Sequence, residues 1–451
     1  MPKGGCKPFS LLILTVLSTA FLANMPNFGE LNGAPPLTDV EYRQKVEELL
    51  KAVLGGIEEV RGLSPPEEVS LRIISAEWAR ENWGRRYVEA NLEKIKVEEN
   101  IYKALFLLPE DAGLAEVLVE WSGDYAAGVI ENDIFVVREN FDPKGAWAER
   151  TLAHEVTHII QGEHFEILEK EKHDEKQAWA ALIEGDAELT AGKYMERIES
   201  LPASETAVLL PAGFLASASA SNSGDLPFMR ILRFPYDYGE DFVETLFERG
   251  GWELVNKAYS SPPVTTEQVM HPEKYFSKEP PVEVDGSSPP LPPEWKQKRS
   301  DRFGEHFILV VLGTWIPLED AAEAAEGWGG DRFTYYEKGE RYLFVWEISW
   351  DSEEDAAEFH DAWSRMMKTL DSEEIREDLW AVQQRYFQLT TEGSTTLILS
   401  SDDLSALEPS KSSGILSVWL VVGVTFILAT ALAWWVKRKS KARVSQAFPL
   451  T

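Results

Sequence analysis

The chain has 451 residues, of which 76 are acidic and 44 are basic, and its formal net charge at pH 7 is −32. This charge excludes the class of nucleic-acid-binding proteins, because such proteins need a basic surface against the phosphate backbone. The only cysteine, Cys6, excludes both a disulfide framework and a cysteine-ligated metal site. The length predicts two folded domains.

The first residues have the pattern of a secretory signal peptide. Two lysines precede an apolar run over residues 9–22, and small side chains near the end of this run suit a cleavage site. We therefore expect residues 1–23 to be a cleaved signal peptide that exports the body of the protein. An uncleaved signal anchor is the alternative.

The body of the chain opens with a helical pattern and then a strand pattern. Apolar residues at helical spacing predict a helix over residues 37–62. A run rich in valine and isoleucine predicts a strand within residues 126–140, with Asn132-Asp133 as a turn or a bulge. This strand either forms an ordinary part of a sheet or offers its edge to an extended peptide.

Two longer helices should follow. Asp142-Pro143 supplies a good N-cap and a good first helical position, so the next helix should run to about Gln161, with Gly162 as its stop. A second helix is expected over about residues 174–199.

The first of these helices contains the sequence HEVTH, residues 154–158. Residues four apart lie one above the other on a helix, so His154 and His158 can offer two imidazoles to one metal ion. Glu155 is rotated by about 100° from His154, which places it beside the ion rather than on it. That position suits a general base acting on a zinc-bound water. Two solvated histidines on a surface helix are the alternative.

Zinc needs a third protein ligand and an open position for water. His164 stands where metzincins have their third histidine, but the glycine that turns the chain in that motif is replaced here by Gln161. The other candidate is Glu184, which lies in the next predicted helix. Glu188 stands one turn further on the same face, where it can hold a histidine ring N–H.

Two residues next to Glu184 carry further expectations. A glycine inside a helix costs about 1 kcal/mol relative to alanine, so Gly185 predicts a close approach of another helix. The helix with the two histidines is the expected neighbour. Asp186 points elsewhere and is expected to be solvated or hydrogen-bonded.

The later part of the chain contains the clearest domain boundary. Residues 239–259 read as two short helices that Gly250-Gly251 separates. A proline-rich segment over residues 279–295 then predicts a semi-rigid linker. Residues 296–400 are expected to form a smaller α+β domain.

This smaller domain shows both strand and helix patterns. Residues 331–350 read as a strand, a Lys-Gly turn and a second strand. Residues 351–370 read as a helix with an acidic first turn. Residues 394–400 read as a closing strand.

The end of the chain has the pattern of a membrane anchor. Residues 414–436 contain no charged side chain, and a helix of this length spans roughly 35 Å, enough for a bilayer core of about 30 Å. The basic residues within 437–451 predict a cytoplasmic tail by the positive-inside rule. We therefore expect a single-pass cell-membrane protein whose body is extracellular. A buried core helix is the alternative.

The motifs HEVTH and ALIEGDAEL together resemble those of the gluzincin zinc metallopeptidases. The resemblance implies that Glu184 is the third zinc ligand, that Glu188 supports the site from outside the ligand set, and that Glu155 is the base. A wider pattern over roughly residues 60–365 resembles an uncharacterised family of exported archaeal and bacterial HExxH proteins. It implies no further chemistry.

Gluzincins often use a downstream histidine or tyrosine to stabilise the oxyanion that forms at the scissile carbonyl. By this resemblance His271 is the leading candidate for a second catalytic residue, and Tyr236 and Tyr238 are the others. A loop histidine and two packing tyrosines are the alternative interpretation.

The sequence thus predicts an α+β protein with a mainly helical zincin-like metallopeptidase domain and a small sheet over residues 37–278, a smaller α+β domain, and one C-terminal transmembrane helix. The predicted function is that of a membrane-anchored, outward-facing metallopeptidase that uses Zn²⁺ to cut a peptide or protein substrate. The alternative is a non-catalytic cell-surface protein that retains the zincin fold and its metal site. No sequence feature indicates an oligomeric state.

Overall fold

The computed structural model describes residues 37–200, 226–285 and 291–407. The predicted signal peptide, membrane span and cytoplasmic tail all lie outside these ranges. Within the described ranges, no helix combines the length and the apolarity that crossing a bilayer requires.

The fold is α+β, as the sequence predicts. The chain divides into two compact units, residues 1–402 and 403–451. The second unit contributes only helix α16 (Leu404–Leu407) to the described residues, so all other elements named below belong to the first unit.

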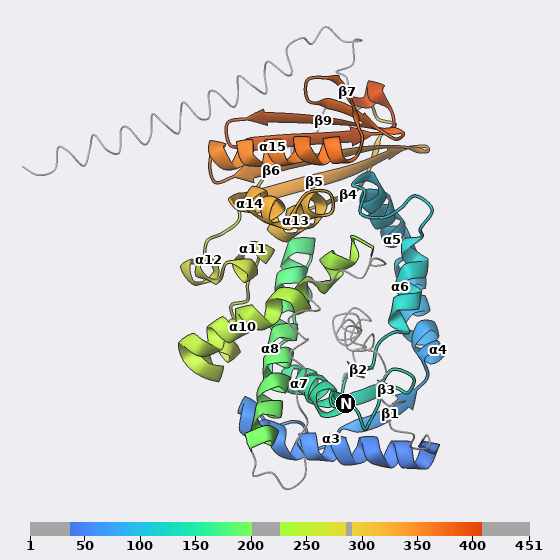
Figure 1. Cartoon of the computed structure of the whole chain (residues 1–451), viewed down its shortest axis with the longest axis vertical. Helices are drawn as coiled ribbons and strands as arrows, with labels where there is room; N and C mark the ends of the chain where they lie inside the picture. Colours follow the sequence, from blue (N-terminus) through green and yellow to red (C-terminus); the bar gives the residue numbers. More distant parts are fainter. Residues whose placement is uncertain (1–36, 201–225, 286–290, 408–451) are drawn as a thin grey trace, which may run out of the picture. The chain divides into compact units, whose positions relative to one another are not determined.

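The first unit begins with helices around a small sheet (Figure 1). Thr38 starts α3 through a capping box with Glu41, and Gly62 ends it in the left-handed conformation that glycine tolerates best. The elements up to the small sheet are α3 (Asp39–Arg61), β1 (Ser70–Ile74), α4 (Ala76–Ala79), the π-helix η2 (Arg80–Arg85), α5 (Arg86–Ala104) and α6 (Leu114–Ser122).

The single strand expected within residues 126–140 is instead a hairpin. Strands β2 (Ala127–Ile130) and β3 (Asp133–Val137) pair antiparallel, and Glu131 takes a positive φ of 56° at the turn between them. The sheet order is β1-β3-β2, with β1 parallel to β3. One face of this sheet packs on α3 and α7 through a shared apolar core.

Helix α7 (Ala148–His164) begins and ends later than the sequence predicts. Asp142 does not cap it, because its carboxylate and carbonyl accept from Lys144 and Gly145 in a separate turn. Gly162 lies inside the helix and does not stop it.

Helices α8 and α10 approach each other so closely at Gly185 and Gly239 that neither position has room for a side chain. Helix α8 is His173–Ser200, and α10 is Met229–Ala258 with non-helical residues at Gly250 and Gly251, where the sequence expects a break. A Cβ added to Gly185 would lie 2.0 Å from the carbonyl oxygen of Gly239. The close approach predicted from Gly185 is therefore present, but the expected neighbour was wrong, because it is α10 rather than α7.

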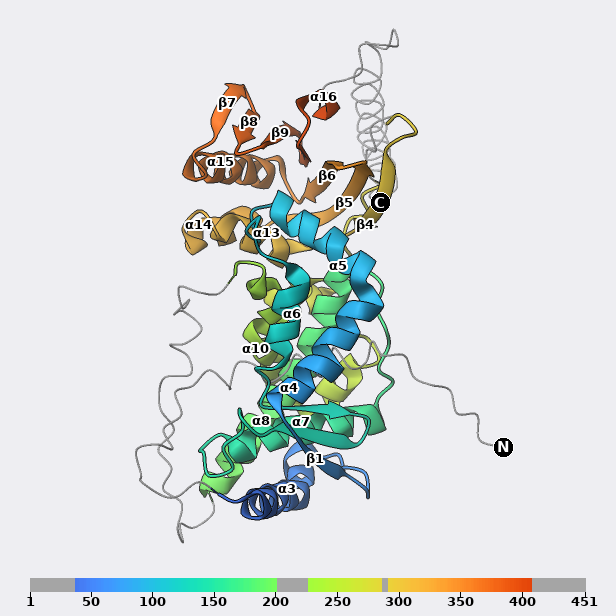
Figure 2. The same ribbon diagram turned by 90° about the vertical axis from the view of Figure 1, so that its right-hand side faces the viewer.

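The remaining elements form a seven-stranded antiparallel sheet with helices. The sheet order is β4-β5-β6-β10-β9-β8-β7, and α15 packs on β6, β9 and β10 and against α14 (Figure 2). The elements are α11 (Thr266–Met270), α12 (Pro272–Ser277), β4 (Lys296–Asp301), α13 (Glu305–Gly313), α14 (Leu318–Ala325), β5 (Trp328–Lys338), β6 (Arg341–Trp350), α15 (Glu353–Thr369), β7 (Glu373–Arg376), β8 (Leu379–Val382), β9 (Arg385–Glu392) and β10 (Thr395–Ser401).

A buried carboxylate connects α8 to α11 and to the residue that follows β4. Asp174, at the start of α8, accepts hydrogen bonds from the backbone and hydroxyl of Thr266 and pairs with Arg302 at 2.9 Å. One apolar core also contains side chains of α5, of α10 and of the sheet. In the predicted linker, Val282 donates a backbone hydrogen bond to Gly329. The division into domains at residues 279–295 stays a prediction.

Candidate metal centre

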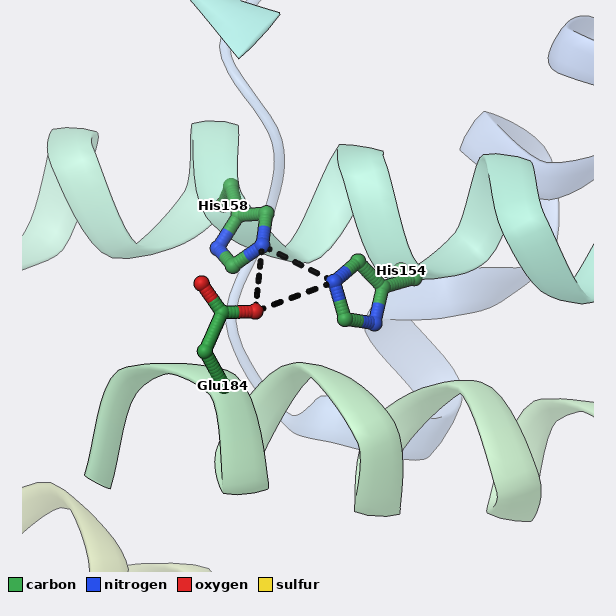
Figure 3. A group of neighbouring side chains, drawn as sticks. All are labelled: His154, His158 and Glu184. Atoms are coloured by element: carbon green, nitrogen blue, oxygen red, sulfur yellow. Dashed lines mark hydrogen bonds and ion pairs between the residues drawn. The ribbon is translucent and has the colours of Figure 1, made fainter. Parts of the chain in front are cut away.

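Three side chains from α7 and α8 converge on one point, as Figure 3 shows. The Nε2 atoms of His154 and His158 are 3.0 Å apart, and Oε2 of Glu184 lies 3.3 Å and 3.4 Å from them. All three side chains are buried, with exposed fractions of 1%, 4% and 1%. The structure thus brings together the three residues that the sequence predicts as metal ligands.

The arrangement follows from helical spacing on two antiparallel helices. His154 and His158 stand one turn apart on α7, and Glu184 and Glu188 stand one turn apart on α8. The opposite side of α7 packs into the apolar core with α3 and the small sheet, which fixes how the helix is rotated. The apolar residues on that side are Leu152, Val156, Ile159 and Ile160.

The outer nitrogen of His154 faces a carboxylate. Its Nδ1 lies 3.1 Å from Oε1 of Glu188, and the other carboxylate oxygen of Glu188 pairs with Arg150, one turn before His154 on α7. A carboxylate paired with arginine can only accept, so the ring proton belongs on Nδ1. In the neutral ring, Nε2 of His154 then presents a lone pair to the centre.

The outer nitrogen of His158 faces an amide instead. Its Nδ1 lies 2.9 Å from Oε1 of Gln161, and Nε2 of Gln161 donates to the backbone carbonyl of Ile183 at 2.8 Å. Since the amide nitrogen is the donor, Oε1 is the acceptor, and the proton of His158 belongs on Nδ1. Nε2 of His158 therefore also presents a lone pair.

The centre fits a bound cation on two counts. Two imidazole lone pairs and a carboxylate oxygen meet there, and neither carboxylate oxygen of Glu184 has a hydrogen-bond partner among the described residues. A tetrahedral ion with bonds of about 2.0–2.1 Å separates its ligand atoms by roughly 3.3 Å. The three observed separations of 3.0, 3.3 and 3.4 Å are close to that value.

The electrostatics of the centre also favour positive charge. Burial lowers the pKa of His154, but the negative charges of Glu188 and Glu184 and its contacts with them outweigh burial and raise the pKa to about 10. The pKa of His158 is likewise raised by Glu184 against the effect of burial. In Glu184, burial raises the pKa but the two histidines lower it below its usual value. Without a metal ion, this group holds protons.

The predicted base, Glu155, follows His154 on α7 and is fully buried. Its negative charge contributes to the raised pKa of His158, which places it within electrostatic range of the metal group.

A tyrosine from α10 lies within electrostatic range of the same centre. The hydroxyl of Tyr236 is buried and has no hydrogen-bond partner among the described residues. Burial, and then the negative charge of Glu184, raise the pKa of Tyr236 well above its usual value, with smaller contributions from Glu188 and Glu155. Tyr236 thus has a hydroxyl donor without an acceptor among the described residues and is electrostatically coupled to the metal group.

The other candidates lie elsewhere. His271 pairs with the buried Glu305 at 2.9 Å, and Tyr238 stacks on Phe234. Nε2 of His164 lies 2.8 Å from the carbonyl oxygen of Ser64 at an exposed position. The structure brings none of the three into the metal group.

A second acidic group has a different chemistry. Glu267, Glu279 and Asp351 offer carboxylate oxygens close to one another, but the ammonium of Lys274 forms an ion pair with all three. A cation of the protein already occupies this group, so it is an ion-pair cluster.

The sequence does not predict a role at the centre for two residues, Gln161 and Arg150. Gln161 was expected only to end a helix and to depart from the metzincin pattern, and Arg150 carried no expectation. The spacing of Arg150 was a signal that it belongs to the centre, because Arg150, His154 and His158 recur every four residues on one face of the helix. Asp186 was expected to be solvated or hydrogen-bonded. It is hydrogen-bonded but fully buried, and it pairs with Arg61 at 2.7 Å.

Comparisons with known proteins add little to this geometry. Residues 292–410 match a family described as a domain of unknown function (DUF8575), a segment that does not include the metal group. A crystal structure of "a putative hydrolase with a novel fold" from Chloroflexus aurantiacus is 15% identical and covers 60% of this chain and 98% of its own. Its TM-score is 0.31, which does not establish a shared fold. No curated protein matches the chain.

Proposed function

We propose that the protein is a zinc-dependent metallopeptidase that hydrolyses peptide bonds with Glu155 as its general base. The supporting observation is the convergence of two imidazole lone pairs and one carboxylate oxygen, each outer nitrogen being held by an acceptor. Two histidines and one glutamate form a donor set that suits Zn²⁺ in catalytic sites.

In this proposal His154, His158 and Glu184 hold the zinc ion. A zinc ion bound there supplies Lewis acidity, which polarises a water molecule and the substrate carbonyl. Glu155 takes a proton from the attacking water and delivers it to the nitrogen of the leaving amine. Glu188 and Gln161 keep the imidazole rings in the orientation and tautomer that binding requires.

Tyr236 is the group that we assign to the developing oxyanion. Its hydroxyl is buried within electrostatic range of Glu184 and has no hydrogen-bond partner among the described residues. A donor that is already fixed at such a site stabilises charge that appears in the transition state. His271, the candidate from the sequence, instead has its Nε2 in contact with the carboxylate of Glu305.

We further propose that residues 414–436 anchor the protein in the cell membrane, with the body outside and the basic tail inside. The support is the sequence pattern of both ends of the chain. Protease added to intact cells should then release the body and leave the tail protected. Cleavage of the tail with protection of the body would reverse this orientation.

The burial of the centre favours a second candidate function. Structural zinc sites are closed, whereas catalytic sites keep an open position. The low exposure of His154, Glu155 and Glu184 is also what a non-catalytic surface protein with a structural metal site would show.

One experiment separates the two functions. The detergent-purified full chain is analysed for zinc content and incubated with an unstructured protein such as casein, with and without a chelator. The peptidase proposal requires about one zinc ion per chain, cleavage that the chelator abolishes, and loss of cleavage in Glu155→Gln with zinc retained. Bound zinc without cleavage of any substrate in a broad panel would support the structural role.

A further inference from the structure

We propose that Gln161 is a positioning residue for His158, and that a buried ion pair between Asp186 and Arg61 holds it there, so that helix α3 contributes to metal affinity. This inference rests on the proposed metal site. It concerns a link between the metal site and a helix that supplies none of its ligands.

The first step is the contact between Gln161 and His158. Oε1 of Gln161 lies 2.9 Å from Nδ1 of His158, while Nε2 of Gln161 is 2.8 Å from the carbonyl oxygen of Ile183 and 3.4 Å from Oδ2 of Asp186. With two acceptors on its nitrogen side, the amide cannot turn over without placing its oxygen against them. Its orientation therefore selects the tautomer of His158 whose Nε2 is free to bind a metal.

The second step is the environment of Asp186. Nε and Nη2 of Arg61 donate to its two carboxylate oxygens at 2.7 Å and 3.0 Å, and both side chains are fully buried. The hydroxyls of Tyr259 and Thr190 donate to the same carboxylate at 2.7 Å and 3.3 Å. A buried carboxylate with this many donors has one orientation, so it is a fixed acceptor for Gln161.

The third step is the origin of Arg61. It is the last residue of α3, 125 residues before Asp186 in the sequence. Its guanidinium lies over the ring of Trp252 at 4.4 Å, so the segment after the kink in α10 also holds it. A chain of direct contacts thus runs from α3 through Asp186 and Gln161 to His158.

This chain has a consequence for metal binding that differs from its contribution to folding. Without Gln161, His158 loses the acceptor for its Nδ1 proton, and the tautomer with a protonated Nε2 becomes available. That tautomer cannot bind a metal through Nε2, the nitrogen that faces the centre, so affinity falls even where the fold is intact. Outer partners of this kind typically contribute about 10–100-fold to metal affinity.

The test compares two glutamines in the purified full chain. Gln161→Met removes the acceptor for His158 and keeps a similar volume. Gln177→Met is the matched control, because Gln177 also donates to a backbone carbonyl, that of Ile231, but contacts no proposed ligand. The measurements are zinc affinity, by competition with a chelator, and the thermal unfolding temperature of the metal-free protein.

The expected result is zinc affinity about 10–100-fold weaker in Gln161→Met and within about 2-fold of wild type in Gln177→Met. Equal zinc affinities in the two variants would overturn the inference, whether both bind normally or both bind weakly. A wild-type protein that binds no zinc would instead refute the proposed function, so the two failures are distinguishable.

A second pair of variants tests the far end of the chain. Arg61→Lys keeps the positive charge and loses the two-pronged contact, so zinc affinity should fall by about 2–10-fold, less than for Gln161→Met. In the Gln161→Met background the same change should have no further effect on zinc affinity, because the link is already broken. Independent, additive effects of the two changes would show that α3 does not act through Gln161.

Discussion

The two histidines of the metal centre are supported in different ways. His154 is held by a carboxylate, Glu188, whose charge Arg150 balances in a direct ion pair. His158 is held by a neutral amide, Gln161, and the balancing charges lie one contact further away in the fully buried pair of Asp186 and Arg61. The support of His154 is a charged contact with a neighbouring ion pair, and the support of His158 is a chain of hydrogen bonds that reaches a distant helix. They should therefore respond differently to mutation and to pH.

The largest expected loss of zinc affinity comes from removing Glu184, the carboxylate that lies near both histidines. Glu184→Ala should weaken zinc binding by more than about 100-fold, beyond the range of an outer partner, because it removes a metal–ligand bond. Equilibrium dialysis with zinc measures this change. His164→Ala is the control and should change affinity by less than about 2-fold, since His164 contacts Ser64 instead. A reversed result would support a metzincin-like site.

The next effect separates the charge of Glu188 from its shape. Glu188→Ala should weaken zinc binding by about 10–100-fold and lower the free energy of unfolding by about 3 kcal/mol, because Arg150 then lacks its buried partner. Glu188→Gln keeps an acceptor for the ring of His154, so zinc affinity should be closer to wild type. Chelator competition and urea unfolding measure the two quantities. Equal zinc affinities in the two variants would show that the acceptor for His154 does not matter.

The pH dependence of the stability of the metal-free protein should depend on the contact between His154 and Glu188. In the metal-free fold its pKa is raised to about 10 from 6.5, against the lowering effect of burial, so protonated His154 stabilises this fold. That stabilisation is complete below about pH 6.5 and is lost as the pH rises toward 10. Urea unfolding of the chelator-treated protein should therefore show stability falling over this range, and less steeply in Glu188→Gln. An equal slope in both proteins would contradict the charged support.

The smallest effect on metal binding should come from α10. Tyr236→Phe touches neither support, so zinc affinity should stay within about 2-fold of wild type. Cleavage of casein should fall by about 10²-fold, as for the loss of one oxyanion donor. His271→Ala is the comparison variant, and it should retain more activity than Tyr236→Phe. The opposite order of activities would assign the stabilisation of the oxyanion to His271.

The contrast between the two supports also shows what the sequence can predict. Glu188 was recognisable because it stands one turn from Glu184, and helical spacing is local information. The support of His158 was not recognisable, because it depends on Arg61, which no spacing rule connects to Asp186. The side-chain types give no signal until the tertiary fold brings them together.

The same distinction between local and long-range information applies to the fold. The α+β class and several elements could be predicted from periodicity and turn residues, including α3, α8 and the strand, turn and strand over residues 331–350. The seven-stranded order and the partner of Gly185 could not, since both depend on contacts between distant segments. The exact start of α7 was missed because Asp142 closes a turn with Gly145 instead of capping a helix.

The contact between Gly185 and Gly239 also limits how the chain can assemble. Leu189 stands one turn after Gly185 on α8, and a leucine in place of that glycine would overlap the backbone of α10. A folding intermediate in which α10 docks one turn too far along α8 is therefore sterically blocked. The two glycines therefore fix the position of α10 along α8. The position of Tyr236 along α8 depends on this contact as well, because Tyr236 stands three residues before Gly239 on α10.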